Sequence, residues 1–196
     1  AILFPTKLLL GLENKAENKK NAFSNSSWKS NWQIVNIGSL QKTNAKIIDQ
    51  KLQVNAYGKD IFSLKDSFGF VYREIKGDFS AEMDIIRVPQ TNEWAKAGLM
   101  VRQNSQPGSK NAGILMSRDH GLRFQFRLKD ENKTKRFFDE MVKVPVKVKI
   151  IKRKNNLSGF YLDKSAKQWV KVGAVNLNFK DPIQVGVAAC SKKENI

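Results

Sequence analysis

The chain has 196 residues, and its 35 Lys and Arg against 18 Asp and Glu give it a formal net charge of +17. Its hydrophobic content of 41% is ordinary for a globular protein. No apolar run reaches the roughly 18 residues that a membrane-spanning helix needs. A single cysteine, Cys190, and a single histidine, His120, exclude an internal disulfide and a Cys/His-rich metal site. We predict no cofactor, and we interpret Cys190 as a buried strand residue.

The positive charge favours polyanionic partners through long-range attraction. Lysines are nevertheless spread along the whole chain, so the charge can equally serve only to keep the surface solvated. Composition therefore leaves a glycan or another polyanion open as a partner without choosing between them.

Residues 1–27 are predicted to form an N-terminal tail or linker, because residues 13–21 contain almost no apolar side chain. The patterned domain is expected over residues 28–196. Alternating apolar and polar residues, separated by turn residues, predict strands over 32–37, 45–48, 51–56, 68–72 and 79–88, the last ending before Pro89.

The most informative stretch runs from Trp94 to Arg127 and predicts three strands, over 94–102, 112–118 and 122–127. In the third strand, apolar and polar residues alternate without interruption. Side chains of a strand point to opposite faces in turn, so Leu122, Phe124 and Phe126 share one face, while Arg123, Gln125 and Arg127 share the other. One face is suited to a hydrophobic core, and the other is rich in guanidinium groups.

Later strands are expected from Phe137 and over 142–152, 159–163, 169–172 and 183–190, and no long helical pattern is found. In the segment 142–152, valines at even positions alternate with lysines. Ten or more short strands with apolar-in, polar-out alternation predict an all-β protein, a two-sheet antiparallel sandwich.

The arginine-rich face is the best candidate for a binding site. Arg102 and Arg118 end the neighbouring strands and can join Arg123, Gln125 and Arg127. Guanidinium groups bind carboxylates or sulfates in a bidentate manner, and Gln can exchange hydrogen bonds with sugar hydroxyls. Trp94 and Tyr72 are candidate stacking platforms for a sugar ring. The alternative interpretations are a solvated sheet face for the arginines and core packing for Trp94.

A nucleic-acid site is not favoured. The basic stretch Lys147–Lys154 follows the alternation expected for the wet face of a sheet, and no nucleic-acid-binding module is recognised.

Several motifs resemble a bacterial family of concanavalin A-like, laminin-G-like sandwiches, also labelled regulation-of-enolase-like, most of whose members have no assigned activity. The resemblance lies in residues 66–72, 77–79, 94–102, 107–110, 121–127, 158–162, 169–173 and 185–189. It implies a concanavalin A-like (jelly-roll) sandwich of two curved antiparallel sheets. It also implies an extracellular or cell-envelope location, with the cytoplasm left open. In that family another strand usually follows the segment equivalent to Val185–Ala189, and we hypothesise that the apolar residues Ile2–Leu12 take its place.

A catalytic role is tested against the concanavalin A-like β-glucanases, which carry Glu-x-Asp-x-x-Glu on one strand. Here Glu82 and Asp84 are followed by Arg87, so the second glutamate is absent and the catalytic pair is incomplete. We therefore predict no catalytic residues.

Together these observations predict a non-catalytic carbohydrate-binding or accessory domain, which recognises a glycan on its polar sheet face. The arginines favour an acidic glycan. A protein-interaction or structural domain without a small ligand is the first alternative, and a glycoside hydrolase is the second.

Overall fold

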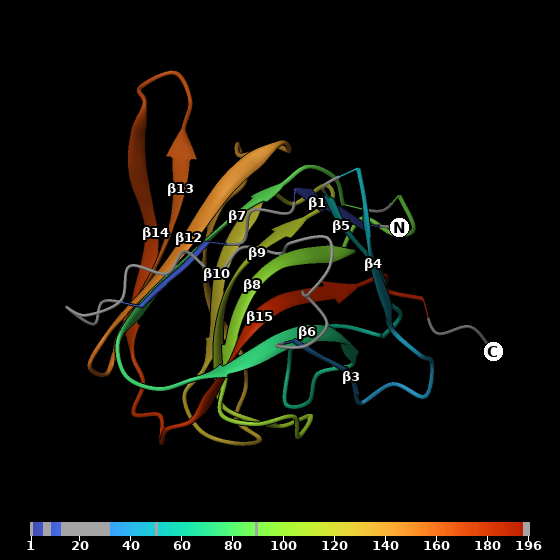
Figure 1. Ribbon diagram of the computed structural model, residues 1–196, viewed down its shortest axis with the longest axis vertical. Helices are drawn as coiled ribbons and strands as arrows, with labels where there is room; N and C mark the ends of the chain where they lie inside the picture. The colour runs from blue at the N-terminus through green and yellow to red at the C-terminus, as the bar shows by residue number, and fades with distance from the viewer. Residues whose placement is uncertain (1, 6–8, 13–31, 50, 89, 194–196) are drawn as a thin grey trace.

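The computed structural model describes residues 2–5, 9–12, 32–49, 51–88 and 90–193, and within these ranges all regular secondary structure is β-strand (Figure 1). The strands are β1 (Ile2–Pro5), β2 (Leu9–Leu12), β3 (Gln33–Ile37), β4 (Asn44–Ile48), β5 (Lys51–Asn55), β6 (Phe68–Ile75), β7 (Phe79–Ile85), β8 (Lys96–Arg102), β9 (Asn111–Ser117), β10 (Leu122–Arg127), β11 (Lys135–Asp139), β12 (Val146–Arg153), β13 (Asn156–Asp163), β14 (Gln168–Asn176) and β15 (Ile183–Cys190).

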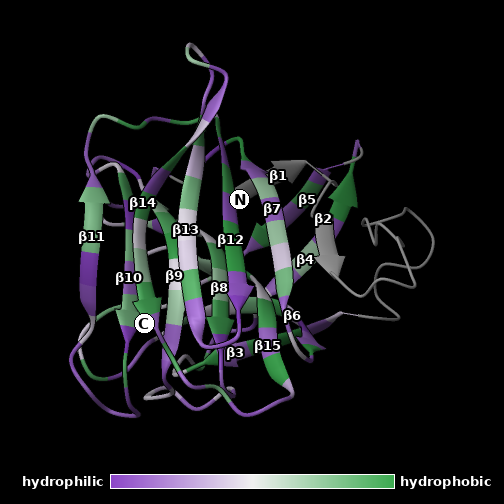
Figure 2. Cartoon of the chain, turned by 90° about the vertical axis from the view of Figure 1, so that its left-hand side faces the viewer, coloured by the Kyte–Doolittle hydropathy of each residue, from purple (hydrophilic) through white to green (hydrophobic). Residues whose placement is uncertain are grey.

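The strands form two large antiparallel sheets and one small one. The seven-stranded sheet has the order β11-β10-β9-β8-β15-β6-β3, and the five-stranded sheet has the order β14-β13-β12-β7-β2. Figure 2 shows the five-stranded sheet in front of the seven-stranded one, with the hydrophilic tip of the β13–β14 hairpin projecting beyond both. Strands β1, β5 and β4 form the third sheet. The architecture is therefore a two-sheet antiparallel sandwich, as the alternation in the sequence predicts.

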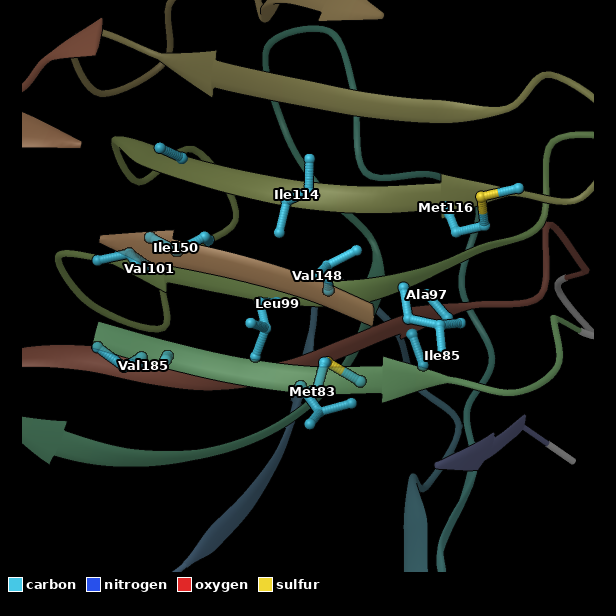
Figure 3. Packing of buried hydrophobic residues seen from close by; sticks show 14 of the residues in the cluster. Met83, Ile85, Ala97, Leu99, Val101, Ile114, Met116, Val148, Ile150 and Val185 are labelled. Atoms are coloured by element: carbon cyan, nitrogen blue, oxygen red, sulfur yellow. The ribbon is translucent and has the colours of Figure 1, made fainter. Parts of the chain in front are cut away.

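The main core lies between the two large sheets. Strands β8, β9 and β15 contribute small and branched side chains, and β7 and β12 contribute the facing layer (Figure 3). In β12 the burial alternates, so that Val146, Val148 and Ile150 are buried while Lys147 and Lys149 are not. This alternation confirms the predicted apolar-in, polar-out pattern of the five-stranded sheet.

A second, smaller apolar cluster lies on the other side of the seven-stranded sheet. Its members come from strands β3, β6, β8, β9 and β15 and from the loop between β5 and β6: Ile37, Ile61, Phe68, Phe70, Tyr72, Met100, Leu115, Ala188 and Cys190. Ile61 is the loop's contribution and has no exposed surface. The loop therefore covers part of a sheet face that the sequence pattern alone leaves open to solvent.

Cys190 is a buried strand residue, as expected, and its Sγ donates a hydrogen bond to the backbone oxygen of Gly58 (3.1 Å). Burial raises the pKa of the Cys190 thiol to about 12, so the group is protonated at neutral pH.

Several strand boundaries differ from expectation, and two of the differences lie near prolines. The strand expected over 79–88 ends at Ile85, and the one expected over 142–152 begins only at Val146. Pro145 lacks the backbone N–H that a paired strand position needs, so the alternation before it is not part of the sheet. Val142 is still buried, whereas Val144 is 36% exposed.

The N-terminal apolar residues pair as two short strands. Strand β1 pairs with β5, and β2 pairs with β7 at the edge of the five-stranded sheet. The hypothesis that they occupy the place of a strand following β15 stays a prediction; the neighbours of β15 are β6 and β8. The boundary predicted at residues 27 and 28 lies outside the described residues. Over the ranges that the structure covers, we find no helix long and apolar enough to cross a membrane.

The packing predicts a large penalty for truncating a side chain between the sheets. Leu99→Ala removes a fully buried side chain and should lower the free energy of unfolding by about 2–5 kcal/mol, because lost apolar contact adds to the cavity left behind. Chemical denaturation measures this. Leu40→Ala is the matched control, since Leu40 is fully exposed, and a similar loss in both variants would contradict the assigned core.

Candidate functional site

The arginine-rich face of β10 points away from the main core, as the alternation predicts, but it is not a solvated surface. Arg123, Gln125 and Arg127 have 3%, 1% and 0% of their surface exposed. The loop of residues 56–67 crosses this face, and Ile61 accepts a hydrogen bond through its backbone oxygen from Gln125 Nε2 (2.6 Å). The chain itself therefore occupies much of the predicted binding face.

Asp66 of this loop holds two arginines. Arg127 Nη1 and Nη2 each donate to its carboxylate at 2.8 Å, and Arg102 Nη1 donates at 2.6 Å. All three side chains are fully or almost fully buried. A buried carboxylate between two guanidinium groups is the arrangement that compensates charges taken out of water.

Arg127 also ties neighbouring loops together. Its guanidinium donates to backbone oxygens of Ser63, Ser109 and Asn132, and to the Thr134 hydroxyl. Arg102 and Arg127, which the sequence suggests as ligand-binding residues, thus serve the protein's own loops in this structure. They differ from the prediction because the loop carries a carboxylate that compensates the arginines. The loop can therefore cover this face of the strand and bury it.

Asp60 of the same loop makes a second attachment. Its carboxylate accepts hydrogen bonds from Lys96 and from Lys192 (2.9 Å). Burial raises the pKa of Asp60, but the two lysines outweigh it and hold the pKa below its ordinary value of 3.8. The pKa of Lys96 is lowered by burial, which its pairing with Asp60 only partly offsets.

Beside this second attachment, a pocket of about 220 Å³ remains open on the same face. Two aromatic side chains, four cationic ones and one amide line it: Phe62, Trp94, Lys96, Arg123, Arg136, Lys192 and Gln125. Residues from β8, β10 and β11, the turn before β8, the loop before β6 and the segment after β15 thus meet at this pocket. We call this the cationic pocket.

Arg123 is the central side chain of the cationic pocket. Its Nε donates to Ser117 Oγ (3.2 Å), and its Nη2 donates to the backbone oxygen of His120 (3.3 Å). The guanidinium carbon lies 4.9 Å from the centroid of the Trp94 ring. Burial and the nearby Arg136 lower its pKa, and the more distant carboxylate of Glu140 only partly offsets them. Among the described residues no carboxylate forms an ion pair with Arg123, so its positive charge is fixed in place without a direct partner.

The two aromatic side chains of the pocket differ in what they present. The imidazole of His120 stacks on Trp94, with ring centroids 3.5 Å apart, so at least one face of the indole is covered. Phe62 lies beneath two cations, at 5.6 Å from Lys96 Nζ and 5.3 Å from the guanidinium carbon of Arg136. Both rings hold cations in place through cation–π contacts.

The remaining predicted site residues lie elsewhere. Tyr72 belongs to the second apolar cluster, stacks on Phe70 and donates its hydroxyl to Gln33 Oε1 (2.7 Å). Arg118 pairs with Asp119 in the turn after β9 and does not line the pocket. Of the seven predicted residues, the pocket brings together Arg123, Gln125 and Trp94.

Four lining residues are missing from the sequence-based prediction. Lys96 could have been found, because it has the same parity on β8 as Arg102 and so shares its face. Arg136 has the equivalent position on β11, opposite Gln125. Phe62 and Lys192 lie outside strands, and no periodic signal places them.

The incomplete catalytic motif lies on the opposite sheet. Glu82 and Asp84 point outward from β7 and face Lys149 and Lys147 of β12, at 3.6 and 3.5 Å. These are cross-strand ion pairs of a sheet surface. In the part of the chain that the structure describes, no group of three or more His, Cys, Asp or Glu side chains could hold a metal ion.

Comparison with known proteins identifies the fold. No family model and no curated protein matches the chain. A functionally unknown protein from Saccharomyces cerevisiae matches with a TM-score of 0.58 and 19% identity, over 84% of this chain and 89% of that one. A legume lectin-like domain from Entamoeba histolytica matches with a TM-score of 0.55 and 8% identity, over 82% of each chain. Carbohydrate binding module CBM66 from Bacillus subtilis matches with a TM-score of 0.51 and 14% identity, over 81% and 86%. The chain has a lectin-like, jelly-roll sandwich fold.

The Asp66 attachment should be essential for stability. Asp66→Asn leaves two buried guanidinium groups without a negative charge and should lower the free energy of unfolding by about 3–5 kcal/mol. Asp119→Asn, which changes an exposed carboxylate, is the control and should change stability by less than about 1 kcal/mol. Equal effects in urea denaturation would show that Asp66 does not hold the face together.

The Asp60 attachment should depend on pH. Because the folded protein depresses the pKa of Asp60, the carboxylate contributes stability above its ordinary pKa of 3.8 and loses that contribution as the pH falls through the folded value. The wild-type protein should therefore be more stable than Asp60→Asn at pH 6, and the gap should shrink below about pH 4. Denaturation curves at both pH values measure this, and a gap independent of pH would contradict the assignment.

Proposed function

We propose that this protein is a non-catalytic carbohydrate-binding domain, and that the cationic pocket on the polar face of its seven-stranded sheet binds the glycan. The observation that carries the proposal is Arg123, a buried guanidinium group with no carboxylate partner among the described residues, at a pocket lined by aromatic rings. Burying a charge without compensation is unfavourable, so a ligand that supplies the opposite charge is the simplest account of the arrangement.

The charge distribution around the pocket supports an acidic glycan. Asp60 is the one carboxylate that contacts a lining residue through an ion pair among the described residues, and it is shared between Lys96 and Lys192. Neither Arg123 nor Arg136 forms an ion pair among the described residues. The net charge of +17 adds a long-range attraction that guides an anionic chain to the surface.

The fold is consistent with this role, since one structural neighbour is a carbohydrate binding module and another is lectin-like. We further propose that the chain belongs among the bacterial concanavalin A-like, regulation-of-enolase-like domains that its motifs resemble. We infer an extracellular or cell-envelope location from that assignment.

Removing Arg123 should abolish most of the binding. In a panel of immobilised neutral and acidic polysaccharides, the wild-type protein should bind acidic ones, and Arg123→Ala should weaken that binding by about 10- to 100-fold, because hydrogen bonds to charged groups contribute about 1.5–3 kcal/mol. Arg153→Ala changes an exposed arginine of the other sheet and should bind like the wild type. Thermal unfolding of each variant controls for loss of structure.

The same binding should weaken as salt is raised, since exposed Arg136 and half-buried Lys192 are screened by ions. Affinity that is unchanged between about 0.05 and 0.5 M salt would show that the charges do not contribute.

A structural or protein-interaction domain is the second candidate, and the Asp66 attachment favours it, because it shows that arginines on this face can serve the chain's own loops. Absence of binding to every saccharide of the panel would decide for this alternative.

A further inference from the structure

We infer that the cationic pocket is built for one acidic sugar unit that carries a carboxylate, a uronic acid, rather than for a neutral sugar or a free inorganic anion. The inference rests on the proposed function and specifies its ligand. Three features of the pocket lead to it: its size, the hydrogen-bonding capacity left on Arg123, and an acceptor on Gln125 that has no donor.

Size limits the ligand to a single unit. The volume of about 220 Å³ is below the roughly 300 Å³ at which pockets for larger ligands begin. The Asp60 and Asp66 attachments hold loop 56–67 over the adjoining part of the face. The volume of the pocket is sufficient for about one sugar ring.

Arg123 requires an anionic acceptor. Two of its three nitrogens, Nε and Nη2, donate to Ser117 Oγ and the His120 backbone oxygen, whereas no acceptor among the described residues takes a hydrogen bond from Nη1. The Trp94 contact fixes the plane of the guanidinium group. Arg136 lines the same pocket from β11 and can approach the same anion. The site therefore presents a fixed planar donor with a second cation beside it, which suits a planar carboxylate.

Gln125 requires a donor. Its Nε2 donates to Ile61, which identifies Oε1 as the acceptor, and Oε1 is buried without a hydrogen-bond partner. Leaving a buried acceptor unsatisfied is unfavourable by about 1–3 kcal/mol. A free inorganic anion offers only acceptors. An acidic sugar carries hydroxyl donors beside its charged group, so a uronic acid can satisfy both Arg123 and Gln125.

The test compares small ligands that differ in one group each. Isothermal titration of the wild-type protein uses glucuronic and galacturonic acid, the parent neutral sugars glucose and galactose, and glucose 6-sulfate. N-acetylglycine, which has a carboxylate and one N–H donor but no sugar ring, is included to represent a peptide terminus. At least one uronic acid should bind about tenfold or more tightly than its neutral parent, the value expected for one charged hydrogen bond, and more tightly than glucose 6-sulfate and N-acetylglycine.

Two variants test whether the planar shape of the guanidinium group matters in addition to its charge. Arg123→Lys keeps the positive charge but removes the planar donor, so the preference for the uronic acid over its neutral parent should fall about tenfold. Arg153→Lys makes the same change on the other sheet and should leave the preference unchanged. Unfolding midpoints confirm that both variants fold.

Each outcome has a defined meaning. Equal binding of uronic acid and neutral sugar, or tighter binding of the sulfated sugar, would overturn the inference while leaving carbohydrate binding intact. Equal binding of N-acetylglycine would overturn it in favour of a peptide carboxylate. If no sugar binds, the proposed function fails, and the inference fails with it.

Discussion

Compensation of buried positive charge organises the outer face of the seven-stranded sheet. Lys96, Arg102, Arg123 and Arg127 project from β8 and β10, and none has more than 3% of its surface exposed. Charges in such surroundings must be neutralised by opposite charges and hydrogen bonds. Loop 56–67 supplies two carboxylates for this purpose. Asp66 neutralises two arginines, Asp60 neutralises Lys96 together with Lys192, and Arg123 lies where the loop provides no carboxylate.

The loop can do this because apolar and backbone contacts fix it between its two carboxylates. Ile61 inserts into the second apolar cluster, and the backbone of Asp60 bridges to that of Ser67. Gly58 is required for the loop's close approach, since its φ of +128° suits glycine and a Cβ there would collide with the Ser67 carbonyl group. The second apolar cluster anchors the loop and so fixes where its two carboxylates lie. Their positions determine which cations of the sheet face form ion pairs within the chain. The cationic pocket is the part of the face that this arrangement leaves open.

The sequence was sufficient for the fold and for about half of the site. Strict alternation in β10 placed Arg123, Gln125 and Arg127 on one face, and this proved correct because side-chain direction in a strand depends only on parity. The alternation of residues does not predict whether the polar face of a strand is exposed to solvent or covered by another part of the chain. Arg127 and Asp66 are 61 residues apart, and an aspartate in a polar loop carries no local signal of its distant partner. The distinction between an arginine paired within the chain and one that lines an open pocket therefore required the tertiary structure.

Arg123 and Arg136 differ in how firmly the protein holds them, and this difference bears on how the pocket could bind an anion. Arg123 is held by Ser117, His120 and Trp94, so its side-chain entropy is already lost in the folded protein. Binding an anion there does not require ordering it again, which favours affinity. Arg136 is exposed on β11, a strand at the edge of the sheet, and its guanidinium group rests on Phe62 and Phe138 at 5.3 and 6.0 Å. In the proposed complex, Arg123 would hold the anion at the base of the pocket, and Arg136 would contact it from the rim. A fixed cation together with an exposed one would then combine a defined ligand orientation with ready access.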